Sequence, residues 1–208
     1  MEAVVRLLRG PHLSNTEARE MVVKKTGSDF PKPETGMQQA VCSHIYDIGI
    51  QETTYKGELK HVHQCIVLWE LEERIKQGDY KGQRFVISKF YTASLNEKAN
   101  LRKDLESWRG RAFTEQELLG FDLDNIRRAN CYLNLVETKN DNGDTKIKVG
   151  AVVPFKKKED GPQTMTPELP DDYCPDWIKK IMEKAVKEQP QASQPDTSGI
   201  EENDEIPF

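Results

Sequence analysis

Several motifs of common enzyme classes are absent from this 208-residue sequence. It has no G-x-S-x-G nucleophile motif, no P-loop, no H-E-x-x-H zinc motif and no glycine-rich dinucleotide loop. No apolar run approaches the ~18 residues that cross a bilayer, and the apolar stretch near the N-terminus is too short for a signal peptide. We therefore expect a soluble protein without enzymatic turnover and without a membrane partner.

Cysteine is scarce, and its four copies form no C-x-x-C pair. Cys42, Cys65 and Cys131 fall in apolar segments with the pattern of strands, and the fourth is Cys174. A free thiol in a strand behaves as a small apolar side chain. This usage predicts a reduced, cytoplasmic protein.

The chain is polar, with 36% hydrophobic residues, 31% charged residues and a mean hydropathy of -0.74. Its net charge of -5 is unevenly distributed. Residues 159–208 contain 13 acids and 4 lysines, a net of -9, which leaves +4 on residues 1–158. A mildly basic body with an acidic tail is therefore expected, and such a body remains compatible with a nucleic-acid partner.

Composition divides the chain into four parts. Residues 1–21 are expected to be a leader, a tag or an alternative start, and 22–158 form the body. Residues 159–188 contain a linker rich in proline and charge and then a helix over 174–188. Residues 189–208 are of low complexity and are expected to be a disordered acidic tail that binds partners.

Five segments of the body have the composition and alternation of strands. They are residues 37–51, 61–73, 83–95, 128–139 and 145–155. Three strands, a helical insert and two more strands predict a mainly β protein, an OB-fold-like five-stranded antiparallel barrel. Another small barrel or an α+β sheet is the alternative. The C-terminal helix either packs on its own barrel or mediates oligomerisation. Cooperative assembly of protomers along single-stranded DNA would be a further mode of self-association.

The insert between the third and fourth strands has helical spacing. Leu101, Leu105 and Trp108 recur on one face, and Trp108 is expected to plug the end of the barrel. Asn96 is the expected N-cap and Gly110 the expected end of this helix. A second, short helix is predicted after Thr114, which begins a T-x-x-E capping box with Glu117.

Nucleic-acid binding by such a barrel needs aromatic rings for the bases and cations for the phosphates. The candidate stacking residues are Tyr46, Trp69, Phe90, Tyr91 and Tyr132. The candidate phosphate contacts are Lys60, Lys89, Lys98, Arg102, Lys103, Arg109, Arg111, Lys146 and Lys148, together with His61 and His63. Aromatics at such positions are more often part of the barrel core than platforms for bases, so each of them is also a candidate for the core.

Strand alternation orders some of these candidates. It places Lys89 and Tyr91 on one face of their strand, and Phe90 on the opposite face, which we expect to be the core. It likewise places Lys146 and Lys148 together, opposite Ile147 and Val149.

A metal site is the competing interpretation. His61, His63 and Cys65 share a strand face, but no fourth ligand with recognisable zinc spacing is present. Two carboxylate pairs could hold Mg²⁺ in a nuclease, although such pairs are more often cap or surface charges: Asp122 with Asp124, and Asp104 with Glu106. No metal and no cofactor is predicted, and a metal-dependent replication nuclease remains an alternative function.

The last residues carry the most specific signal. Acids, including Asp204 and Glu205, are followed by Ile206, Pro207 and Phe208. This ending resembles the C-terminal tip of bacterial single-stranded DNA-binding proteins. Over residues 37–155 the body is similar to phage-encoded single-stranded DNA-binding proteins with an OB core, in the segments "CIVLWELEE", "RFVISKFYTASLNEKANLRKDLESWRGRAFTEQELLGFDL" and "NCYLNLVET".

The resemblance implies a protein that coats single-stranded DNA without sequence preference, in phage replication or recombination or in DNA repair, in the cytoplasm of a bacterial host. It also implies that the tip recruits other replication or recombination proteins. The ring of Phe208 would fill an apolar pocket of the partner while the acids steer toward a positive surface. The alternative from another class is an adaptor whose barrel binds protein.

Overall fold

A computed structural model describes residues 31–55, 57–139, 143–156 and 161–186. The chain divides into two units, residues 1–30 and 31–208, and all described residues belong to the second. The expected leader (1–21) and acidic tail (189–208) lie outside the described residues. Among the described helices, none has the length and apolar character needed to cross a membrane.

Five antiparallel strands form one sheet, so the mainly β prediction is confirmed. In the order β3-β2-β1-β4-β5, the sheet contains β1 (Gly36–Tyr55), β2 (Glu58–Arg74), β3 (Arg84–Thr92), β4 (Asn130–Lys139) and β5 (Thr145–Pro154). β1 and β2 are longer than predicted and continue as a two-stranded ribbon beyond the segments that pair with β4 and β3. Gly57, with a φ of +85°, lies between them in a conformation that favours glycine.

The insert between β3 and β4 is helical, as predicted, and consists of α1 (Asn100–Arg109), α2 (Glu115–Leu118) and a 3₁₀ turn, η1 (Leu123–Ile126). Gly110 ends α1 with a φ of +68°, and the capping box of Thr114 and Glu117 is present. The expected N-cap is wrong. Asn96 instead accepts the backbone N–H of Lys98 in a turn before α1, and the helix begins four residues later.

The sheet is not closed into a barrel. β3 and β5 are its edges, and no ladder joins them in the described part of the chain. α1 contacts both edge strands. Asp104 accepts the Tyr91 hydroxyl of β3 at 2.7 Å, and the Ser107 hydroxyl donates to the Val152 carbonyl of β5 at 2.6 Å. α1 therefore bridges the edge strands β3 and β5, which in a closed barrel would be hydrogen-bonded to each other.

The main core lies between the sheet and this insert. Trp69 and Trp108 pack with ring centroids 6.0 Å apart, and the Trp108 indole N–H donates to the Asn130 carbonyl at 3.0 Å. Trp108 is thus a core residue between the insert and the sheet, but it does not plug a barrel as predicted, because the sheet is open. The strand cysteines are also buried, and burial raises the pKa of the Cys42 thiol to about 12, which keeps it protonated.

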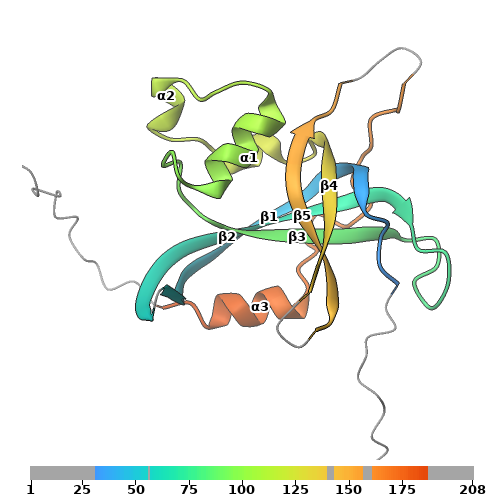
Figure 1. The fold of residues 1–208 in the computed structure, drawn as a ribbon, viewed down its shortest axis with the longest axis horizontal. Coiled ribbons are helices and arrows are strands. Elements are labelled where there is room, and N and C mark those ends of the chain that lie inside the picture. The colour runs from blue at the N-terminus through green and yellow to red at the C-terminus, as the bar shows by residue number, and fades with distance from the viewer. Residues whose placement is uncertain (1–30, 56, 140–142, 157–160, 187–208) are drawn as a thin grey trace, which may run out of the picture. The chain divides into compact units, whose positions relative to one another are not determined.

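The opposite face of the sheet is covered by the C-terminal part of the chain, and Figure 1 shows α3 (Asp176–Glu183) on the side of the strands opposite α1. Ile178 of α3 is fully buried against Tyr46, Ile48 and Leu68. Of the two alternatives for this helix, the structure shows packing on its own sheet. We call residues 161–186 the C-terminal strap.

The strap includes most of the predicted linker, which has neither helix nor strand yet contacts the sheet. The side-chain amide of Asn130 pairs with the backbone of Met165, which is buried. Because the strap covers one face and the insert the other, β2 is buried on both faces from Cys65 to Leu71.

Candidate nucleic-acid interface

Two predicted stacking residues are inside the protein. Trp69 is fully buried and Tyr91 nearly so, both in the core beside α1. Phe90, which we expected in the core, is 48% exposed. The alternation of β3 is as predicted, but the larger core lies on the Lys89 and Tyr91 side, so the assignment of faces was wrong.

The partly buried amine of Lys89 is stabilised at the edge of this core by a carboxylate partner. Its amine lies 2.6 Å from Asp104, the same carboxylate that accepts the Tyr91 hydroxyl. Burial, followed by the charge of Asp104, raises the pKa of Tyr91 far above its usual range, so the phenol remains a donor. Lys89 and Tyr91 therefore form a structural cluster with Asp104, in which the amine of Lys89 and the hydroxyl of Tyr91 are both engaged.

The predicted arginines are also engaged in ion pairs. Arg102 pairs with Glu106 at 3.0 Å, one turn along α1. Arg109 and Arg111 both bind Glu117 of α2. The hydrogen bond from Arg111, then that from the Thr114 backbone and the contacts of Arg109, lower the pKa of Glu117 to about 2. These arginines hold the helical insert together.

The predicted histidines lie on the β1–β2 ribbon, each beside a carboxylate. His63 is 2.7 Å from Asp47, and His61 is 3.3 Å from Glu52. Lys60, next to them on β2, is exposed. Within the described ranges no group of three or more His, Cys, Asp or Glu side chains could hold a metal ion.

Two other predicted aromatics are partly or wholly covered. The Tyr46 hydroxyl donates to the Tyr173 carbonyl of the C-terminal strap. Tyr132 is half-buried on β4, with its ring 5.5 Å from that of Phe155. Both residues are less exposed to solvent than Phe90.

The exposed ring of Phe90 borders a pocket of about 440 Å³. This pocket lies where β3 leads into α1, and we call it the β3–α1 pocket. Polar side chains of Gln64, Asn96 and Asn100 line it, and Lys98 supplies a cation. It thus combines an aromatic surface, hydrogen-bonding groups and a positive charge.

Four predicted cations keep their charge available. In the part of the chain that the structure describes, their side chains make no hydrogen bond or ion pair, and all four are exposed: Lys98, Lys103, Lys146 and Lys148. The alternation predicted for β5 is confirmed, because Lys146 and Lys148 are exposed while Ile147 packs on the core and Val149 is buried. Of the four, only Lys98 lines the pocket beside Phe90.

Sequence reasoning missed the β3–α1 pocket because it assigned Phe90 to the core. Alternation separates the faces of a strand but does not say which face meets the larger core. The helical pattern after β3 was the usable signal. The helix α1 packs on the face of β3 that carries Lys89 and Tyr91, because both side chains bind Asp104 of α1. Asp104 is adjacent to Leu105, whose side chain is in the main core. The tail residues 204–208 lie outside the described residues.

Comparison with protein-family models and with curated protein sequences finds no match for this chain.

Proposed function

We propose that this protein binds single-stranded DNA without sequence preference, through the exposed aromatic surface beside the β3–α1 pocket. The observation that carries the proposal is Phe90, half-exposed at a pocket of mixed polar and apolar lining that contains the unpaired cation Lys98. Aromatic stacking combined with cations along the backbone is the general mode of single-strand binding without sequence preference. The protein acts by coating strands and has no catalytic turnover.

The arrangement of strands supports an OB-fold-like core for the proposed single-strand-binding domain. Three consecutive strands, a helical insert and two strands follow the OB order. β3 and β5 approach each other and α1 contacts both, which supports the proposal of an OB-like core whose sheet is left open.

The resemblance of the last residues supports a second role. In the proposal, the acids Asp204 and Glu205 with Ile206, Pro207 and Phe208 recruit replication or recombination proteins. The Gln-, Pro- and Ser-rich segment before them supplies reach. Phage replication or recombination in a bacterial host is the setting that the resemblance implies.

A salt titration tests the proposed function. Fluorescently labelled oligo-dT is titrated with the full chain at several salt concentrations, with duplex DNA of equal length as competitor. We expect binding whose logarithm falls linearly with the logarithm of salt, by about 0.7 per phosphate neutralised, and weak competition by duplex. Absence of oligo-dT binding at low salt would contradict the proposal and favour a protein-binding adaptor.

A further inference from the structure

A second exposed aromatic ring lies beside Phe90, and the C-terminal strap supplies it. Trp177, in the first turn of α3, is 41% exposed. Its ring centroid is 6.1 Å from that of Phe90, and the planes are tilted by 42°. Single exposed apolar residues are ordinary on protein surfaces. Two adjacent rings from segments far apart in the sequence form a larger apolar surface.

The strap is fixed to the sheet by a buried carboxylate. Glu70 of β2 is 1% exposed. Its oxygens accept the backbone N–H groups of Glu168 and Leu169 at 2.8–3.1 Å. Hydrogen bonds to a buried charge are stronger than neutral ones, so this contact anchors the strap before α3.

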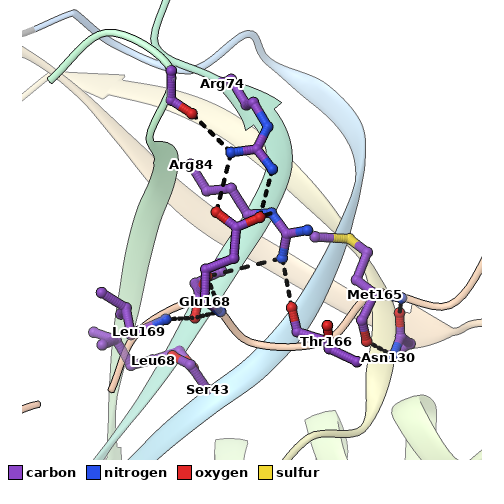
Figure 2. Close-up of polar contacts among 11 residues, drawn as sticks. Ser43, Leu68, Arg74, Arg84, Asn130, Met165, Thr166, Glu168 and Leu169 are labelled. Atoms are coloured by element: carbon purple, nitrogen blue, oxygen red, sulfur yellow. Dashed lines mark hydrogen bonds and ion pairs between the residues drawn. The ribbon is translucent and has the colours of Figure 1, made fainter.

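Further contacts extend this anchor. Figure 2 shows Arg74 and Arg84 converging on the Glu168 carboxylate, and Arg84 also donates to the Thr166 carbonyl at 2.8 Å. After Glu168 in the sequence, the fully buried side chain of Ile178 packs α3 against the sheet. Trp177 therefore lies between the hydrogen bonds at Glu168 and the packed side chain of Ile178, which give it a defined position next to Phe90.

Cations are placed to accompany the two rings. Lys98 lines the pocket at Phe90. Lys180 is exposed three positions after Trp177, a spacing that puts two side chains on the same side of a helix. A base with its adjoining phosphate matches rings flanked by cations, whereas an apolar peptide would not use the charges.

We propose that the C-terminal strap is part of the nucleic-acid-binding surface, and that Trp177 and Phe90 form a two-ring platform on which bases of a single strand stack. This inference rests on the proposed function and adds to it an element outside the five-stranded core. It assigns the strap a direct role in binding ligand, beyond covering one face of the sheet.

Tryptophan emission of the full chain tests this assignment. The protein has three tryptophans, and Trp69 and Trp108 are buried. Stacked bases should therefore quench only the emission of Trp177. We expect oligo-dT to quench part of the emission of the wild type, and to leave the emission of Trp177→Phe unchanged although that variant still binds.

The oligo-dT affinities of Trp177 variants show whether bases stack on the Trp177 ring or only lie close to it. We expect Trp177→Ala and Trp177→Leu to bind labelled oligo-dT roughly 5- to 150-fold more weakly, as for loss of one stacked base. Trp177→Phe, which keeps a ring, should remain close to wild type. Leu119→Ala is the matched control, because Leu119 is 90% exposed and does not line the β3–α1 pocket. The emission of the two buried tryptophans reports whether each variant is folded.

The results distinguish this inference from the proposed function. If the wild type binds oligo-dT but its emission does not change, or if Trp177→Ala and Trp177→Leu both bind like wild type, the role of the strap is overturned and the proposed function stands. If the wild type does not bind oligo-dT at all, the proposed function itself fails.

Discussion

At the scale of single residues, the neighbours Phe90 and Tyr91 have opposite environments. Tyr91 is buried and hydrogen-bonded to Asp104, whereas Phe90 is half-exposed. Both are aromatic residues of one strand and both line the β3–α1 pocket, but strand alternation leaves only the ring of Phe90 widely exposed. A substitution at Tyr91 should therefore affect stability, and one at Phe90 should affect binding.

Tyr91→Phe removes the hydroxyl that donates to Asp104 and keeps the ring in the core. We expect a loss of about 1 kcal/mol in the free energy of unfolding, as for one hydrogen bond. Affinity for oligo-dT should not change. Urea denaturation measures the first quantity, and anisotropy of labelled oligo-dT the second. A large loss of affinity with unchanged stability would show that the Tyr91 hydroxyl meets the ligand.

At the scale of elements, α2 contributes a titratable contact. The pKa of Glu117 is lowered from 4.5 to about 2 by the hydrogen bond from Arg111, followed by the Thr114 backbone and Arg109. A carboxyl group with a lowered pKa in the folded state stabilises the protein fully above the unfolded value, and this contribution is lost as the pH falls toward the folded value.

Glu117→Gln should therefore lower stability near neutral pH, and its difference from wild type should shrink between about pH 4.5 and pH 2. Urea denaturation of both proteins across this range measures the difference. A difference that stays constant down to pH 2 would show that the Glu117 charge does not stabilise the insert.

The C-terminal strap is the second element with a sharp energetic prediction. Glu70→Gln removes the buried charge that binds the backbone of Glu168 and Leu169. We expect a loss of about 2 kcal/mol in the free energy of unfolding, and faster cleavage within residues 161–186 in limited proteolysis. Glu168→Gln is the control. Its carboxylate is 45% exposed, so we expect a smaller loss, under about 1 kcal/mol. Equal losses in the two variants would show that the Glu70 carboxylate does not anchor the strap.

The strap also shows where prediction from sequence ended. Alternation and turn residues predicted five strands and the helical insert between the third and fourth, because these are local patterns. Residues 161–175 have neither the hydrophobic period of a helix nor that of a strand. The residues of β2 that they contact are distant in the sequence. One indirect signal was present: the unbroken apolar run from Cys65 to Trp69, since a strand that is apolar on both faces needs cover on both.

At the scale of the whole molecule, charge is separated between body and tail. Residues 159–208 carry -9 and the rest +4. In the proposed function the tail acids repel the phosphates of DNA or compete with them for cations. A protein truncated to residues 1–200 should therefore bind oligo-dT as tightly as the full chain or more tightly, with the largest gain at low salt, because screening weakens both effects. Weaker binding by the truncated protein in the same anisotropy assay would contradict this account.

The candidate site was only partly predictable at this scale. Lys98 was predicted and lines the β3–α1 pocket, whereas Arg102, Arg109 and Arg111 proved to be engaged within the insert. Sequence shows that cations are present, but which of them are neutralised depends on carboxylates brought close by folding. The same holds for Trp177, whose neighbour Phe90 lies on another element.

The most direct test of the central claim is the affinity of three proteins for labelled oligo-dT at low salt: wild type, Phe90→Ala and Leu119→Ala. The account predicts that wild type and Leu119→Ala bind equally, and that Phe90→Ala binds roughly 5- to 150-fold more weakly while losing only about 1 kcal/mol in the free energy of unfolding. Equal affinity of all three proteins, or no binding by the wild type, would contradict it.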